Sequence, residues 1–208
     1  MDTKEEKAKL RLARKGLNIF YYGKGKGKTT AAMGVAARAL GAGMNVYILQ
    51  FVKARRPKDG QKLAPGEWPL SSEILFFEEA TKYLPEDFGK IETDQLGLGF
   101  VGILGDRKER SVHIEQAKKG LEEAKKLIAS DKYDVIVLDE LVSALELNLI
   151  SEGDILDILN SKPKHLHLVY TGHDPFAGIL EASDLASEIN MVKHPYYKGI
   201  LAQKGIDF

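Results

Sequence analysis

The stretch Tyr22-Gly-Lys-Gly-Lys-Gly-Lys-Thr-Thr30 decides the fold of this chain, and it directly follows a short apolar run, LNIFYY. The residues from Thr29 to Leu40 favour a helix, which the glycines at 41 and 43 would close. A strand, a glycine-rich loop and a helix in this order are the context of a P-loop, whose backbone N–H groups and helix N-terminus bind phosphate. We therefore expect the triphosphate of a nucleotide to bind at this turn.

The residue types of the loop have separate expected tasks. The glycines let the backbone approach phosphate oxygens closely, Lys28 supplies a positive charge, and Thr29 has the hydroxyl that completes a Mg²⁺ shell. The strict pattern GxxxxGK[ST] needs a glycine where this chain has Tyr22, so the loop is a variant. A flexible Gly/Lys turn is the alternative interpretation. The expected nucleotide-binding residues of the loop are Gly23, Lys24, Gly25, Lys26, Gly27, Lys28, Thr29 and Thr30.

A later strand, Tyr133 to Asp139 (YDVIVLD), ends in two adjacent acids. P-loop proteins use a carboxylate at the end of a neighbouring strand to hold Mg²⁺ or its waters. Asp139 and Glu140 are therefore the expected metal-site residues together with Thr29, and either acid could face the metal. Acids at strand ends also cap helices, which is the alternative reading.

Strands and helices alternate along the chain, which predicts an open, mostly parallel α/β sheet with helices on both faces, of the P-loop NTPase-like, RecA-like class. Further strands are expected at Asn45 to Val52, Glu73 to Glu78 and Leu166 to Thr171. Further helices are expected at Asp106 to Ser130, Ser143 to Ile150, Ser151 to Asn160 and Phe176 to Glu188. Residues 53–72 and 79–105 are expected to be largely irregular. Residues 1–15 are expected to form an arm or a tail, and residues 16–208 a single domain.

Composition narrows the functional classes. The chain has 208 residues, in which 30 basic and 30 acidic side chains cancel, so no global field attracts nucleic acid or an anionic membrane. It has no cysteine, which excludes disulfides and cysteine-built metal sites. It also lacks a secretory signal and an apolar run of about 20 residues. A cytoplasmic protein with neither nucleic-acid nor membrane partners is expected.

Two other patterns carry weaker signals. Gly97 to Gly102 reads GxGxxG, but the expected absence of a preceding strand indicates a plain loop and not a dinucleotide site. His165 and His167 lie on one face of a strand without an evident third ligand, so ordinary histidines are expected and not a metal site.

Charged residues form two further patterns. The basic cluster in the loop after the second strand either binds a phosphate or another acidic group or is solvated; it consists of Lys53, Arg55, Arg56 and Lys58. The pairs Glu115/Lys119 and Glu122/Lys126 are one helical turn apart and indicate a solvated helix face.

Five segments together resemble one family over nearly the whole length: GKGKGKTTAAMGVAARALGAG, ILQFVK, VIVLDEL, YTGHDP and VKHPYYKGILAQKGIDF. This chain resembles the P-loop ATP:corrinoid adenosyltransferases, which adenosylate cobalt in vitamin B12 synthesis and salvage. The family shares the shifted glycine spacing, so Tyr22 supports the resemblance.

The resemblance implies that a Co(I) corrinoid, the second substrate, attacks the 5′ carbon of ATP and that the whole triphosphate leaves. It implies that ATP lies in the loop in reversed polarity, with Mg²⁺, or Mn²⁺ in its place. Lys28, Glu140 and Phe100 are the implied catalytic residues, and His173 is implied to bind the nucleotide. The resemblance implies two partners, a reduced flavoprotein that donates the electron and a second copy of the chain. Residues 1–15 of each copy would cover the site of the other.

Three positions depart from the family pattern. Gly102 stands where the family has a tryptophan beside the corrin, His173 where it has the arginine of TGR, and Lys24 where many relatives have asparagine. These departures suggest a divergent member with another corrinoid preference or a weakened activity. Two alternatives stay open: another P-loop enzyme such as an NTPase or a kinase, and a non-catalytic nucleotide- or corrinoid-binding regulator.

Overall fold

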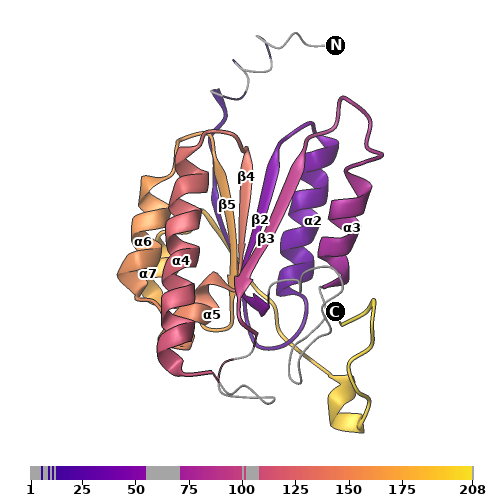
Figure 1. The fold of residues 1–208 in the computed structure, drawn as a ribbon, viewed down its shortest axis with the longest axis vertical. Coiled ribbons are helices and arrows are strands. Elements are labelled where there is room, and N and C mark those ends of the chain that lie inside the picture. Colours follow the sequence, from indigo (N-terminus) through magenta and orange to yellow (C-terminus); the bar gives the residue numbers. More distant parts are fainter. Residues whose placement is uncertain are drawn as a thin grey trace.

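The computed structural model describes residues 6, 9, 11, 13–54, 71–99, 101 and 108–207. Six parallel strands form one sheet in the order β3-β2-β4-β5-β1-β6 (Figure 1). The strands are β1 (Asn18–Tyr22), β2 (Val46–Ala54), β3 (Ile91–Gly97), β4 (Val135–Asp139), β5 (His167–Gly172) and β6 (Leu185–Glu188). The helices are α2 (Lys28–Gly41), α3 (Ser72–Ala80), α4 (Arg110–Ala129), α5 (Leu141–Glu146), α6 (Glu152–Ser161), α7 (Ala177–Glu181) and a 3₁₀ turn, η1 (Pro195–Lys198).

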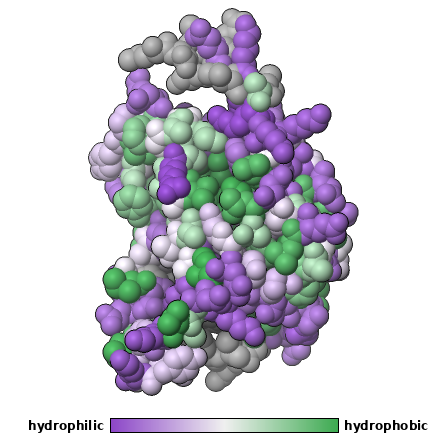
Figure 2. All heavy atoms as spheres, turned by 180° about the vertical axis from the view of Figure 1, so that it is seen from behind, coloured by the Kyte–Doolittle hydropathy of each residue, from purple (hydrophilic) through white to green (hydrophobic). Residues whose placement is uncertain are grey.

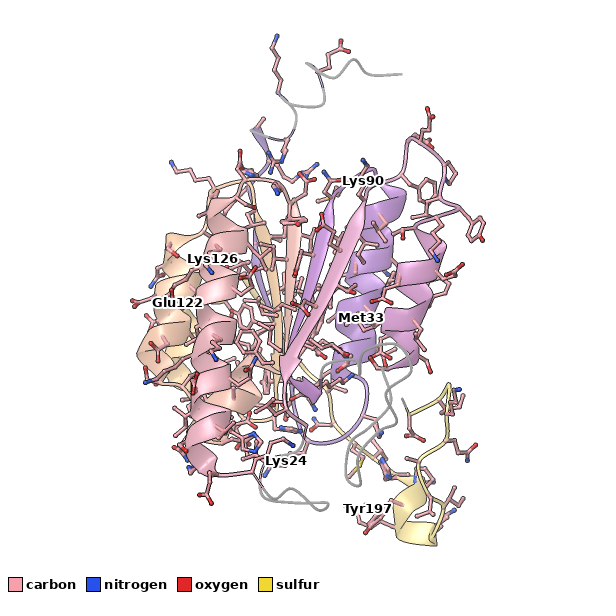
Figure 3. All side chains as sticks on the ribbon, in the orientation of Figure 1. Lys24, Met33, Lys90, Glu122, Lys126 and Tyr197 are labelled. Carbon is pink, nitrogen blue, oxygen red and sulfur yellow. The ribbon has the colours of Figure 1, made fainter. Side chains whose placement is uncertain are left out.

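The helices cover both faces of the sheet, as the alternation of elements predicts. Helices α2 and α3 pack on one face, where Ala32, Ala36 and Ile74 are buried against strand residues, and Met33 points toward the sheet (Figure 3). Helices α4 to α7 pack on the other face, around residues such as Leu121 (Figure 1). The predicted class, an open parallel α/β sheet, is confirmed, and every described strand pair is parallel because each connection crosses over through a helix.

The segment expected as a strand at Glu73 to Glu78 is helix α3, so that prediction was wrong. Ile74 and Phe77, three residues apart, are the buried side chains, while Phe76 is 63% exposed. This spacing is the helical period and not the alternation of a strand. The aromatic and branched composition of EILFFE suggested a strand, but the position of the segment against α2 and β3 favours the helix.

Strand β3 lies in a segment that was expected to be irregular. Its sequence IETDQLG is polar because it is an edge strand, and Ile91, Gln95 and Gly97 are its buried residues. A strand therefore does precede the GxGxxG pattern, contrary to the expectation. A Cβ on Gly97 would lie 2.1 Å from the Val52 carbonyl oxygen, so close packing against β2 explains this glycine.

The helix expected from Phe176 to Glu188 is shorter and is followed by strand β6. Asp184 stops it, because its N–H donates to the Asn18 carbonyl and its Oδ2 accepts from the Asn18 N–H at 2.8 Å. These bonds start the pairing of β6 with β1. The remaining predicted elements are confirmed within a few residues.

The outer face of α4 is solvated, as its charge spacing predicts. Glu122 and Lys126 lie on this face, away from the sheet (Figure 3). The Glu115–Lys119 pair forms at 2.7 Å. Glu122 pairs with Lys125 at 3.8 Å instead of with Lys126. Among the described residues, no helix combines the length and apolarity needed to cross a bilayer.

Candidate functional site

The predicted site residues that the structure describes come together at the carboxyl edge of the sheet. Strand β1 runs into the loop at Tyr22, β4 ends at Asp139, and β5 ends at Gly172. Lys24 lies at this edge and Lys90 at the opposite one (Figure 3). Parallel α/β sheets bind ligands at the carboxyl ends of their strands, so the fold places the loop and the acids where a ligand is expected.

The glycines of the loop are required by its backbone. Gly23, Gly25 and Gly27 have φ angles of 122°, 104° and 117°, which residues with a Cβ rarely adopt. A Cβ on Gly23 would also lie 2.3 Å from the Ile189 carbonyl oxygen, and one on Gly25 2.7 Å from the Met191 Cβ. The loop therefore runs closely against the segment that follows β6.

Lys28 is the first residue of α2 and is buried. Its Nζ donates hydrogen bonds of 2.8 Å to the carbonyl oxygens of Gly23 and Gly25. Burial lowers the pKa of Lys28, and the nearby carboxylates of Glu140 and Glu146 oppose that effect. The ammonium is thus held inside the loop, where phosphate oxygens would arrive.

Thr29 and Asp139, two of the expected metal-site residues, are in direct contact. The Thr29 hydroxyl donates to Asp139 Oδ1 at 3.0 Å, and the Thr171 hydroxyl donates to the same oxygen at 2.9 Å. Gln50 Nε2 donates to Asp139 Oδ2 at 2.9 Å, and the Lys53 Nζ is 3.9 Å from that oxygen. The Asp139 carboxylate is fully buried. The hydroxyls of Thr29 and Thr171 and the amide of Gln50 hold it in place.

Gln50 and Gln95 form a buried chain toward this acid that the sequence analysis missed. Gln95 Nε2 donates to Gln50 Oε1 at 2.6 Å, and Gln50 in turn donates to Asp139. The available signal was the glutamine in the middle of the apolar strand segment NVYILQFV, because buried amides need partners. Chains of this kind hold an acceptor in place in a low dielectric.

Glu140 has a left-handed backbone, with φ 61°, which turns the chain from β4 into α5. Its N–H donates to the Thr171 hydroxyl at 2.7 Å. Burial and the adjacent Asp139 raise the pKa of Glu140. The two acids therefore differ: Asp139 makes the contact with Thr29, and Glu140 is the acid whose ionised form is disfavoured.

His173 follows β5 and faces α5. Its Nδ1 lies 2.9 Å from Glu146 Oε2 and 3.2 Å from the Ser143 hydroxyl. A Cβ on Gly172 would lie 2.4 Å from the Val142 Cβ, so this glycine lets α5 approach the strand end. Glu146 had not been identified from the sequence, because nothing in the spacing of a helical acid connects it to a residue 27 positions away.

The other loop lysines are exposed or paired. Lys24 is exposed, as is Thr30, and Lys26 pairs with Asp207 of the C-terminal segment at 2.9 Å. That segment projects from the body (Figure 1), and apolar side chains are exposed along it (Figure 2). Tyr197 and Val192 are among its exposed residues.

The basic cluster and the expected corrin-facing residues are only partly within the described residues. Lys53 pairs with Glu73 at 2.9 Å. Burial lowers the pKa of Lys53, but the carboxylates of Asp139 and Glu73 outweigh that effect, so the pKa is raised overall. The other members of the basic cluster, Arg55, Arg56 and Lys58, lie outside the described residues. So do the two expected corrin-facing positions after β3, Phe100 and Gly102.

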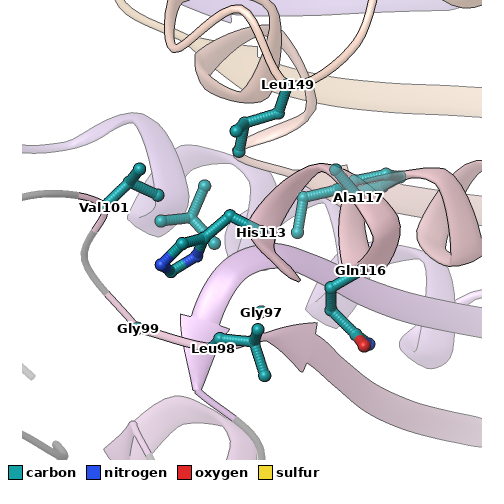
Figure 4. A pocket seen from close by; sticks show the side chains of 10 residues that line it. Gly97, Leu98, Gly99, Val101, His113, Gln116, Ala117 and Leu149 are labelled. Carbon is teal, nitrogen blue, oxygen red and sulfur yellow. The ribbon is translucent and has the colours of Figure 1, made fainter. Parts of the chain in front are cut away.

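A small pocket opens beside the ends of β2 and β3 (Figure 4). Gly97, Leu98, Gly99 and Val101 line one side, and His113 of α4 lines another. The pocket therefore borders the chain on both sides of position 100.

The amino edge of the sheet carries a different set of charges. Asp134 Oδ1 accepts from Arg11 Nε at 2.9 Å and from Arg14 Nη1 at 3.2 Å, and its Oδ2 accepts from the Asn45 N–H at 2.8 Å. His167 Nδ1 accepts from the Leu17 N–H. Within the described part of the chain, no group of three or more His, Asp or Glu side chains is arranged to hold a metal ion.

Known proteins resemble this chain over most of its length. The family model for "ATP:corrinoid adenosyltransferase BtuR/CobO/CobP" matches residues 14–208. The corrinoid adenosyltransferase of Sinorhizobium sp is 32% identical over 196 residues, 93% of this chain and 81% of that protein. Corrinoid adenosyltransferase CobA of Salmonella typhimurium is 31% identical over 93% of this chain and 86% of its own length.

The corrinoid adenosyltransferase of Escherichia coli K12 is 31% identical over 208 residues, 98% of this chain and 93% of that protein. One solved structure, EssC (ATPases 2 and 3) from Geobacillus thermodenitrificans, aligns at 13% identity with a TM-score of 0.42, over 92% of this chain and 35% of that one, a likeness too weak to add to the argument. The family match spans almost the whole sheet and every element that carries the site. This chain belongs to the ATP:corrinoid adenosyltransferase family.

Proposed function

We propose that this protein transfers the 5′-deoxyadenosyl group of ATP to the Co(I) of a corrinoid and releases triphosphate. Family membership supports the reaction. The observation that carries it to this chain is the contact between Thr29 and Asp139 beside the buried Lys28. The loop, its lysine and the acid are all retained, which supports a catalyst over a non-catalytic binder.

Cobalt is the nucleophile in this reaction, so no side chain needs to act as a general base. The demand on the protein is electrostatic, because negative charge grows on the leaving triphosphate. Lys28 and the N–H groups of the loop from Lys24 to Thr29 would stabilise that charge, and preorganised donors of this kind make a large contribution to catalysis. In reversed polarity the γ-phosphate would lie deepest in the loop and the 5′ carbon would face outward.

The oxygen donors beside the loop fit a divalent cation. Thr29 and Asp139 would hold Mg²⁺, or Mn²⁺, because hydroxyl and carboxylate oxygens suit these ions. The cation would supply positive charge to the triphosphate oxygens. Gln50 and Thr171 fix Asp139, and Glu140 is the second carboxylate of the site. His173 takes the position of the family arginine on the nucleotide.

The corrinoid would bind beyond the loop, toward the chain after β3. Phe100 is the proposed contact on the lower axial side of the corrin, and the pocket lined by Gly97, Leu98 and Val101 borders it. Glycine in place of tryptophan at position 102 would leave more room there, which fits a different corrinoid preference.

A reduced flavoprotein is the proposed donor of the electron that makes Co(I), and a cytoplasmic location is proposed as well. A homodimer is proposed in which residues 1–15 cover the neighbouring site. In support, Arg11 and Arg14 hold this segment at the amino edge, across the sheet from its own loop.

The test is an incubation with ATP, Mg²⁺ and chemically reduced cobalamin, followed by the corrinoid spectrum and by analysis of the phosphate product. The expected result is formation of the cobalt–carbon bond with one triphosphate released per bond. Orthophosphate release with an unchanged corrinoid spectrum would instead show an NTPase. ATP binding without either change would show a regulator.

A further inference from the structure

Glu146 is the last residue of α5, and it binds the turn after β5 through three bonds. Its Oε1 accepts from the N–H groups of His173 and Asp174 at 2.6 and 2.9 Å, and its Oε2 lies 2.9 Å from His173 Nδ1. The side chain is 14% exposed. Both oxygens are therefore committed to one neighbouring turn, which is more than an ordinary helix-end acid does.

The bond to Nδ1 decides which ring nitrogen of His173 is left for a ligand. An ionised carboxylate only accepts hydrogen bonds, so the hydrogen lies on Nδ1. A neutral ring would then present a lone pair at Nε2, which repels a phosphate oxygen, whereas the imidazolium presents an N–H there. A carboxylate behind one nitrogen favours the imidazolium and fixes the ring.

We propose that Glu146 is a positioning residue that holds the His173 ring with its Nε2–H directed to a phosphate oxygen of bound ATP. The proposal rests on the proposed function, because it takes His173 as a nucleotide-binding residue. The pair Glu146–His173 then supplies, from two side chains, the planar cationic donor that the family obtains from one arginine.

The charges around the ring are compatible with this role. Lys28 opposes protonation of His173, while Glu140 and Glu146 favour it, and Ser143 contributes a hydroxyl at 3.2 Å. The hydrogen bond to Glu146 is the largest influence and raises the pKa of His173. The pKa of Glu146 is lowered in return: burial opposes ionisation, but the bonds from the His173 ring and the two amides outweigh it.

The experiment measures the affinity of Mg²⁺–ATP by calorimetry in the free protein, so that it does not depend on corrinoid turnover. Glu146→Gln keeps an oxygen that can accept from the two amides but removes the charge. We expect it to weaken ATP binding about tenfold in the wild-type background, as for loss of a charge-assisted hydrogen bond. In a His173→Ala background the same change should have less than a twofold effect. Glu181→Gln, on the exposed end of α7, is the matched control and should bind like wild type.

A pH series separates positioning from scaffolding. The ratio of wild-type to His173→Ala affinity cancels the titration of ATP itself and should fall as the pH rises above about 6.5. In Glu146→Gln that fall should move to lower pH. An equal loss in both backgrounds, with an unmoved profile, would mean that Glu146 only scaffolds the turn and would overturn the proposal. Failure of the wild-type protein to bind ATP would overturn the proposed function as well.

Discussion

Strand β4 carries an aspartate at each end, and the two acids have opposite surroundings. Asp134, just before the strand, accepts from the guanidinium groups of Arg11 and Arg14. Among the described residues, those that donate to Asp139, at its end, are all neutral: Thr29, Thr171 and Gln50. The Asp134 carboxylate is neutralised by two guanidinium groups, and its role is to stabilise the fold. The Asp139 carboxylate is held by hydroxyls and an amide, so its negative charge stays available for a cation.

Strand β5 repeats the contrast with histidines. His167 at its start accepts a backbone N–H, and burial, together with Arg14 and Lys162, lowers its pKa. His173, just past its end, is held by Glu146, which raises its pKa. The amino edge thus favours the neutral ring and the carboxyl edge the charged one. Four substitutions test this division, in order of decreasing expected effect.

Lys28→Ala should have the largest effect on the carboxyl edge. It removes the charge that stabilises the leaving triphosphate, so kcat should fall about a thousandfold, or about 4 kcal/mol of transition-state stabilisation. Single-turnover formation of the cobalt–carbon bond measures this directly. Turnover at the wild-type rate would mean that the loop is not the triphosphate site.

Asp139→Asn should lower kcat about a hundredfold, because it removes the negative charge offered to the cation. Titration of activity with Mg²⁺ and with Mn²⁺ is the measurement, and the half-saturating concentration should rise. If the variant instead lost its thermal stability and kept its metal dependence, the two ends of β4 would have been assigned the wrong way round.

Asp134→Asn should show the reverse pattern. Loss of the bonds from two partly buried guanidinium groups should cost about 1–3 kcal/mol of unfolding free energy. Denaturant unfolding measures this cost, and kcat for each folded molecule should stay within about twofold of wild type. A large loss of kcat without a loss of stability would contradict the division of the two edges.

The smallest expected effect is a loss of stability in weak acid caused by His167. The folded pKa lies below the unfolded value of about 6.5, so its contribution is complete above that pH and declines as the pH falls through it. Thermal unfolding between pH 7.5 and 5.5 should show part of the decline disappearing in His167→Gln, compared with wild type. Identical curves for both proteins would remove His167 as the cause.

The carboxyl edge was largely predictable from the sequence, because glycines, a lysine and adjacent acids have few other reasons to follow buried strands. The order of the expected elements also sufficed to place Thr29, Asp139 and His173 at one edge, since parallel strands end together. What stayed open was which of Asp139 and Glu140 meets Thr29. That depends on the direction of one side chain, which spacing does not encode.

The misassigned elements have a common physical cause. Segments α3, β3 and β6 lie at the sheet's edges or on its outer side, where half of each element contacts solvent and its apolar pattern is diluted. Contacts such as Gln50 to Asp139 and Glu146 to His173 join residues 89 and 27 positions apart. They exist only once the sheet is assembled, so a local pattern can mark one residue as needing a partner but cannot identify that partner.

The left-handed backbone of Glu140 has a consequence for anyone who engineers this protein. Glycine at that position would relieve about 1–2 kcal/mol of steric cost and would also remove a half-buried carboxylate. A selection that rewards heat resistance alone would therefore enrich Glu140→Gly while it discards an acid of the site. Residual activity has to be measured alongside melting temperature, because a substitution that raises stability at this residue removes a carboxylate of the proposed site.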